Sequence, residues 1–142
     1  MGIKASFGPD GAFGLVGTQT DNAGRGFVPV STEWVATSVD KVFFVAARPF
    51  EVVAINARVT VAGTNGSAVT AVVRKVASGT AIGSGTALHS GSVNLKGTAN
   101  TNQTLTLTGS AVSLAAGDCL AIDFSGTLTD ATGAVTVTLI PK

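Results

Sequence analysis

The sequence predicts an all-β domain, an antiparallel β-sandwich that is jelly-roll-like and is preceded by an extended N-terminal arm. Short apolar segments recur along the chain with Thr, Ser, Gly and Asn between them, as strands with one exposed face require. Turn-forming residues return roughly every 8–12 positions, which suits a sandwich of about eight strands. No stretch combines helical apolar spacing with a capping residue. A chain of 142 residues is expected to form one domain whose core needs no disulfide.

The first 26 residues differ in composition from the rest of the chain. They contain seven glycines, each of which would cost a helix about 1 kcal/mol relative to alanine. Two interpretations stay open: a loosely tethered terminus, or an extended arm whose isolated aromatic side chains dock into a neighbouring subunit. The arm merits a test because each buried phenylalanine contributes about 1.5–3 kcal/mol. We therefore divide the chain into an arm, residues 1–26, and a β-sandwich domain, residues 27–142. The candidate contact residues are Phe7, Phe13, Leu15, Val16 and Phe27.

The first expected strand is Phe27–Ser31, and Pro29 confines it to the edge of a sheet. Trp34, the only tryptophan, follows it. We expect Trp34 to be a core or rim aromatic whose indole N–H has a hydrogen-bond partner. The alternative is a platform on which a sugar stacks. A lone tryptophan supports that alternative weakly, because sugar-binding faces usually combine several aromatic and acidic residues.

The clearest strand signal is Val53–Val61, where the odd-numbered residues are apolar and are expected to face the core. Before it, Lys41–Ala47 is expected to form a buried strand. After it, Asn65 and Gly66 are typical of a tight hairpin turn, which would return the chain antiparallel along Val69–Ala77. Both faces of this returning strand are partly apolar, which indicates a central strand or a second covered surface.

The segment after this hairpin is rich in small residues. Ser78–Ala87 is expected to be a loop, and Leu88–Leu95 one or two weak strands. His89, the only histidine, has no Cys, Asp or Glu at ligand spacing, and we expect it to be exposed. Leu105 and Leu107 alternate with threonines and are expected to point inward.

The stretch Ser113–Phe124 organises the C-terminal part of the chain. Gly117 supplies backbone freedom for a corner, and the Asp118 carboxylate can accept a hydrogen bond from a nearby backbone N–H. The strand after the corner carries three large apolar residues on one face, and we expect it to pair with the last strand, Val135–Ile140, as a hairpin. These three residues are Leu120, Ile122 and Phe124.

The residue inventory argues against catalysis. The formal net charge is +1 and the basic residues are scattered, which disfavours nucleic acid as a partner. No apolar run approaches the ~20 residues of a membrane helix. Cys119 is expected to be a small buried hydrophobe, and Asp118 and Asp123 are expected on opposite faces of their strand. We therefore expect no enzyme activity, no metal or other cofactor, no membrane partner and no small-molecule substrate. With only 12% charged residues, the surface is expected to be partly covered by another protein.

Three stretches of the chain resemble small structural proteins of tailed bacteriophages: Val42–Gly63, Gly85–Thr101 and Ser113–Leu139. In those proteins a Leu-Ala-Ala-Gly-Asp corner is followed by an apolar strand, a tip rich in Thr and Gly, and a final strand of alternating Val and Thr. The resemblance is to capsid decoration (cement) proteins and other head-associated proteins.

This resemblance implies a virion structural protein that decorates and stabilises the capsid by binding the major capsid protein. It also implies a homotrimer, an N-terminal arm that grips the capsid protein, and a place on the capsid surface after synthesis in the host bacterial cytoplasm. The role of the arm rests on composition and analogy. Two alternatives stay open. One is a phage tail, fibre or baseplate domain that binds a receptor or glycan. The other is a secreted adhesin-like or carbohydrate-binding module, which would need an export signal.

Overall fold

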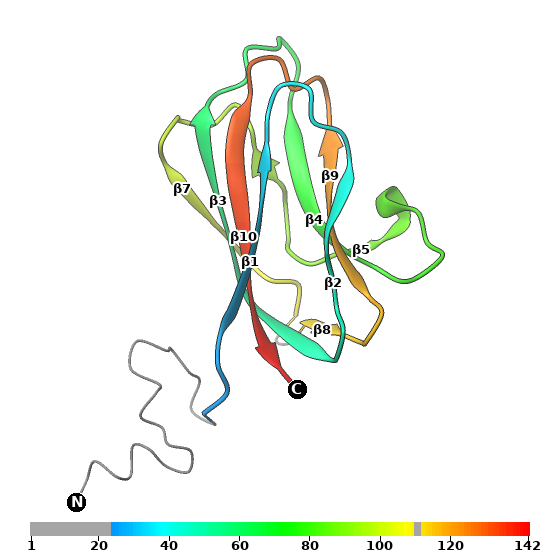
Figure 1. Ribbon diagram of the computed structural model, residues 1–142. Coiled ribbons are helices and arrows are strands. Elements are labelled where there is room, and N and C mark those ends of the chain that lie inside the picture. The colour runs from blue at the N-terminus through cyan, green and yellow to red at the C-terminus, as the bar shows by residue number, and fades with distance from the viewer. Residues whose placement is uncertain (1–23, 110–111) are drawn as a thin grey trace, which may run out of the picture.

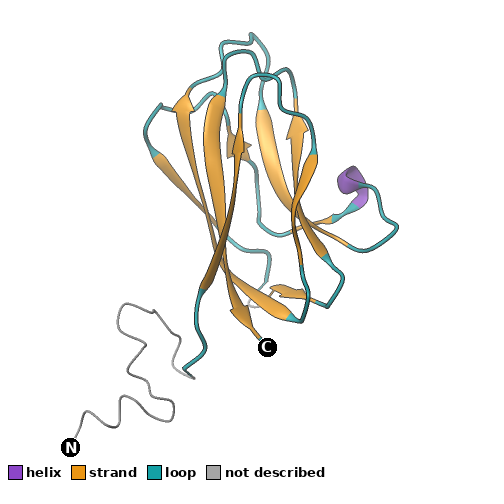
Figure 2. Ribbon diagram, in the orientation of Figure 1, coloured by secondary structure: helices purple, strands orange, loops and turns teal. Residues whose placement is uncertain are grey.

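The computed structural model describes residues 24–109 and 112–142, which form a sandwich of two antiparallel sheets (Figures 1 and 2). This confirms the predicted all-β sandwich. The described residues also contain one turn of 3-10 helix, η2 (Ile82–Ser84). The strands are β1 (Val28–Trp34), β2 (Lys41–Val45), β3 (Phe50–Val61), β4 (Thr70–Val76), β5 (Thr86–Ala87), β6 (Val93–Asn94), β7 (Asn102–Leu105), β8 (Val112–Leu114), β9 (Cys119–Ser125) and β10 (Thr132–Pro141).

The β1 sheet has the strand order β1-β10-β3-β7, with β8 also beside β3, and the β2 sheet has the order β2-β9-β4-β5, with β6 also beside β4. The chain therefore passes from one sheet to the other at six of the nine connections between these strands. The short pairs β5/β6 and β7/β8 each extend one position in their sheet. This alternation between sheets is compatible with the predicted jelly-roll-like arrangement. The domain boundary at residue 26 stays a prediction, because residues 1–23 lie outside the described part of the chain.

The core lies between the two sheets and is built from the alternating apolar residues of the longest strands. In β10 the inward residues Val135, Val137 and Leu139 are at most 1% exposed, and in β9 Leu120 and Ile122 are fully buried. Phe124 is half-buried and packs against this core. The predicted inward faces of both strands are therefore confirmed.

The alternation in β3 is interrupted at both ends of the strand. Ile55, Ala57 and Val59 are buried as predicted. Val61, however, is 49% exposed, and Val52 rather than Val53 is buried. The pairing of β3 with β10 shifts register at two places, between Thr132 and Gly133 and between Thr138 and Leu139. An irregularity of this kind turns the following residues to the other face, so a strict period of two was wrong beyond the middle of the strand.

Two predicted hairpins are wrong. β3 and β4, on either side of the Asn65-Gly66 turn, lie in opposite sheets, and so do β9 and β10. β9 pairs with β2 and β4 instead, whereas β10 pairs with β1 and β3. The turn residues correctly mark where the chain reverses, but they do not determine whether the chain stays in its sheet or crosses to the other one. β4 is a central strand, as its two apolar faces indicated.

β1 and β2, the first strands in the orders of the two sheets, are edge strands. β1 is an edge strand as Pro29 predicted, and Pro29 itself is exposed. β2 was expected to be buried, and this was wrong. It lies at the edge of its sheet, where Val42 is 44% and Val45 is 60% exposed. An apolar sequence alone does not separate a central strand from an edge strand that a partner could cover.

Candidate functional site

One side of the sandwich is closed by backbone hydrogen bonds between the sheets. The backbone N–H of Leu88 donates to Val73 of β4 (3.0 Å), and the N–H of Thr108 donates to Leu88 (3.0 Å). The N–H of Ser90 donates to Thr106 (2.9 Å), just beyond β7. The segment at residues 88–90 therefore continues both sheets at once, so this side of the molecule exposes no gap between the two layers.

The opposite side of the sandwich is open. There the sheets end in β1 and β2, and within the described residues each of these strands pairs on one side only, β1 with β10 and β2 with β9. Apolar side chains line both strands. We call this surface the open edge: Val28, Val30, Val42, Phe43, Phe44 and Val45.

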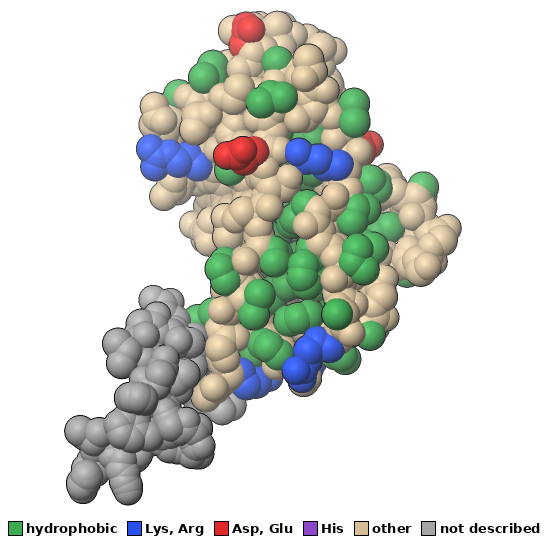
Figure 3. Space-filling view, viewed as in Figure 1, with side chains coloured by type: hydrophobic (Ala, Val, Ile, Leu, Met, Phe, Trp, Pro, Cys, Tyr) green, Lys and Arg blue, Asp and Glu red, His purple; other side chains and the backbone are tan. Residues whose placement is uncertain are grey.

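Figure 3 shows hydrophobic side chains gathered over the region of β1 and β2. Four of the open-edge residues are partly buried against the core, whereas Val42 and Val45 stand exposed on the outer face of β2. A polar contact spans the two strands: the Nζ of Lys41 donates to the backbone carbonyl of Glu33 (2.5 Å). Unpaired strand edges bearing apolar side chains are usually protected or used for binding, so the open edge is the candidate interaction site.

The outer face of the β2 sheet is covered over β4 but not over β2. Arg74 holds the loop that contains η2 across this face. Its Nε is 2.6 Å from the Asp123 carboxylate and its Nη1 donates to the Gly85 carbonyl at 2.9 Å. Beneath this cover Val76 and Ala121 are almost fully buried. The exposed valines of β2 lie on the same sheet without such a cover.

Trp34 lies at the end of β1 and is 1% exposed. Its ring meets Phe124 edge-on, with the ring centroids 6.5 Å apart, so the prediction of a core aromatic is confirmed. The indole N–H, however, has no hydrogen-bond partner among the described residues, so that part of the prediction was wrong. The hydroxyls of Thr60 and Thr132, which line the same pocket as Trp34, form a hydrogen bond with each other at 2.7 Å.

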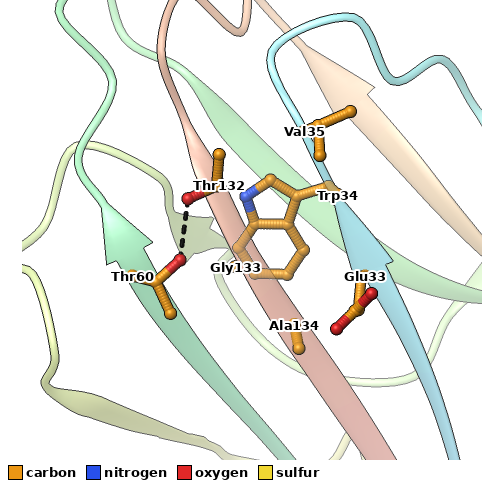
Figure 4. A pocket seen from close by; sticks show the side chains of 7 residues that line it. All are labelled: Glu33, Trp34, Val35, Thr60, Thr132, Gly133 and Ala134. Atoms are coloured by element: carbon orange, nitrogen blue, oxygen red, sulfur yellow. Dashed lines mark hydrogen bonds between the residues drawn. The ribbon is translucent and has the colours of Figure 1, made fainter.

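Trp34 also forms part of a surface pocket of about 210 Å³ (Figure 4). In Figure 4 the indole nitrogen is directed toward the side of the pocket where Thr132 lies. The ring itself is buried, which removes it as a stacking platform for a sugar. The pocket is lined by Glu33, Trp34, Val35, Thr60, Thr132, Gly133 and Ala134.

The corner before β9 has the predicted construction. Gly117 adopts a positive φ of 90°, and the Asp118 carboxylate accepts a hydrogen bond from the Ala115 N–H at 2.8 Å. Asp123 is paired with Arg74 instead, so the two acids have separate structural partners. Cys119 is half-buried rather than buried, and it lies between Val45 of β2 and Val76 of β4.

The predicted arm contacts lie mostly outside the described residues. This applies to Phe7, Phe13, Leu15 and Val16, whose role stays a prediction. Phe27 is described and is half-buried immediately before β1. The segment predicted to be an arm therefore precedes β1, the strand that borders the open edge.

His89 is 2% exposed, so the expectation of an exposed side chain was wrong. Its Nε2 accepts a hydrogen bond from the Val73 N–H at 3.0 Å, which requires the neutral ring. Burial lowers the pKa of His89 below its ordinary value of 6.5; the hydrogen bond to the Ser90 carbonyl opposes this shift and the charge of Arg74 adds to it. His89 therefore has a structural role: it accepts a backbone hydrogen bond within the segment that joins the two sheets.

The stability of the domain is expected to decrease as the pH falls below about 6.5. Unfolded His89 takes up a proton there, whereas the folded ring resists protonation because its pKa is lowered, so acid favours the unfolded chain. In His89→Gln the amide oxygen can accept the Val73 N–H without titrating, and this component of the pH dependence should disappear. Urea unfolding at a series of pH values measures both proteins, and equal slopes would contradict the assignment.

Among the described residues, no group of three or more His, Cys, Asp or Glu side chains is placed to hold a metal ion. In the same part of the chain, no helix has the length and apolar character needed to cross a membrane.

No protein-family model matches the chain, and no curated protein matches it. Two solved structures are similar over most of the chain. One is from Bacillus endospore appendages, described as a novel family of disulfide-linked pili; it is 16% identical, with 88% of this chain and 96% of that chain covered and a TM-score of 0.37. The other is from infectious bursal disease virus, Gx strain; it is 12% identical, with 82% of this chain and 30% of that chain covered and a TM-score of 0.39. With both TM-scores below 0.5, these likenesses support no conclusion about function.

Proposed function

We propose that this chain is a virion structural protein that decorates and stabilises a phage capsid by binding the major capsid protein. The observation that carries the proposal is the open edge, an apolar surface formed by two edge strands that each pair on one side only within the described residues. Such a surface is suited to contact with another protein. The resemblance of Val42–Gly63 and of the strands after Gly117 to decoration proteins gives this contact its proposed partner.

The chemistry of the described residues fits a structural role. Asp118 caps its own corner and Asp123 is paired with Arg74, while His89 is used as a backbone acceptor. His89, whose pKa is lowered by burial, is thus held in a backbone hydrogen bond of the fold. A capsid offers a repeating surface, so self-association into a homotrimer would multiply weak contacts through effective concentration. We place the protein on the outer surface of the capsid.

Removing residues 1–26 is expected to leave the sandwich folded and to abolish attachment to the capsid. The physical reason is the loss of the predicted contacts Phe7, Phe13, Leu15 and Val16, which are worth roughly 1.5–3 kcal/mol for each phenylalanine that is buried. Co-sedimentation of the purified protein with capsids that lack it measures attachment, and the thermal melting curve reports folding.

The double variant Phe7→Ala/Phe13→Ala serves as the smaller change, and Val61→Ala, far from the arm in sequence and on the exposed end of β3, serves as its control. Full occupancy by the truncated protein would show that the arm does not hold the capsid. A folded full-length protein that fails to sediment with capsids at any concentration would contradict the proposed function itself.

A further inference from the structure

We propose that the open edge accepts the apolar amino-terminal segment, residues 3–16, of a second copy of this chain as an added strand. The inference goes beyond the proposed function, because it concerns the free protein and needs no capsid. In this inference the open edge is the acceptor surface for residues 3–16, the same segment that we propose to contact the capsid. The segment would then have two acceptors, the neighbouring copy before assembly and the capsid protein after it.

One side of the sandwich is closed and the other is open, and an added strand would close the open side. On the closed side the segment around His89 bonds to strands of both sheets. On the open side β1 and β2 each end their sheet. A strand added along the edge of β2 would pair with its backbone and direct alternate side chains inward and outward. The inward set would cover Val30 and Phe44, which pack on the core, and the outward set would lie beside Val42 and Val45.

The amino-terminal sequence has the spacing that such a strand needs. Its four largest apolar residues all occupy odd positions, so in an extended chain they share one face. These four residues are Ile3, Phe7, Phe13 and Leu15. The even-numbered positions, which form the opposite face, are polar or small except for Val16: Lys4, Ser6, Gly8, Asp10, Ala12, Gly14 and Val16.

The length of the connecting sequence favours a second copy over the same chain. β1 is seven residues long, and Gly24 has a positive φ of 80°, which suits a turn. If the chain folded back at Gly24, residues 14–20 would lie opposite β1. Leu15 and Val16 would then lie beside the far end of β1, but Ile3, Phe7 and Phe13 would extend beyond that end. An extended linker formed by residues 17–23 instead spans about 23 Å and carries all of these apolar residues to a neighbour.

The experiment mixes two variants of the full-length chain. The arm variant, Phe13→Ser/Leu15→Ser, keeps a normal open edge, and the edge variant, Val42→Lys/Val45→Lys, keeps a normal arm. The edge variant replaces exposed side chains, 44% and 60% accessible, so the core is untouched. Lysine on a strand edge disfavours the addition of another strand. Light scattering and sedimentation velocity measure the masses of each protein alone and of their mixture.

The expected result is that the unaltered chain self-associates, with a trimer near three times 14.0 kDa if the heterologous contacts close into a ring. Each variant alone should associate at least about tenfold more weakly. The mixture should form a dimer of one arm variant and one edge variant, because one intact arm then meets one intact edge. Complementation of this kind distinguishes arm exchange from a symmetric contact between two edges.

A matched control is Val61→Lys, which alters a valine of similar exposure, 49%, on β3 rather than on β2. It should associate like the unaltered chain, and melting curves should show all variants folded. A monomeric unaltered chain at every concentration would overturn the inference, as would association that survives in the arm variant. Either result would leave capsid binding, which is measured separately, to be judged by co-sedimentation.

Discussion

Replacing Gly133 with alanine is expected to destabilise the domain by about 3 kcal/mol, the upper range for forcing an atom into a packed core. A Cβ at this position would collide with the Arg58 carbonyl oxygen and with Cζ2 of Trp34, and would lie 2.9 Å from Cε2 of the same ring. Neither neighbour can easily move, since Arg58 belongs to the central strand β3 and the indole is buried against Phe124. The Trp34 ring thus occupies the space that a side chain at residue 133 would need.

The matched control is Gly66→Ala, because a Cβ there would have no heavy atom within 4 Å. It should change the free energy of unfolding by less than about 0.5 kcal/mol, the usual effect of a surface substitution. Urea unfolding followed by far-ultraviolet circular dichroism gives the stability, and the fluorescence of the single tryptophan reports on its packing. A Gly133→Ala protein as stable as the control would show that the ring does not lie over this position.

Replacing Ile122 with alanine is expected to cost roughly 2–5 kcal/mol, because the change leaves a cavity in a packed core. Ile122 is fully buried in β9, opposite Val73 of the neighbouring strand β4. Chemical denaturation measures the loss. Leu120→Ala should give a loss of the same size from the same face of the strand.

Val42→Ala is the contrasting variant, since this side chain in the adjacent strand β2 is 44% exposed. It should cost well under 1 kcal/mol in the free monomer, as an exposed side chain buries little surface. A loss below about 0.5 kcal/mol for Ile122→Ala would mean that the inward face of β9 is reversed.

The strands and their inward faces could be predicted where alternation is local and uninterrupted. In β10 the pattern of Val and Thr was sufficient, because every inward residue from Val135 to Leu139 follows a period of two. In β3 the same reasoning failed near Val53 and Val61, since the register shifts opposite them depend on how β10 is paired. A bulge has no signal in the sequence of one strand alone.

Strand pairing could not be predicted from turn residues. Asn65 and Gly66 mark a reversal, yet the strands on either side of them enter different sheets. The loop after β9 shows what fixes such a crossing: a Cβ on Gly126 would collide with the carbonyl oxygen of Ala68, so the loop passes directly against the chain before β4. That contact joins residues far apart in sequence, which local propensity cannot reveal.

Only part of the candidate site could be predicted from the sequence. The composition of residues 1–26 indicated an arm, but the open edge depends on β1 and β2 both ending their sheets, which follows from the strand order. His89 was missed for a similar reason: its burial comes from bridging two sheets, whereas its neighbours Ser90 and Gly91 are exposed and suggested a loop. The indole N–H of Trp34 has no partner among the described residues, which no pattern in the sequence indicated.

The measurement that tests the central claim most directly is the location of this protein in purified phage particles. Virions are separated on a density gradient, heads are detached from tails, and each fraction is probed for the chain by quantitative mass spectrometry. Our account predicts that the protein is found with the heads, in a fixed ratio to the major capsid protein. Its absence from particles, or its presence with the tails alone, would contradict a role in capsid decoration.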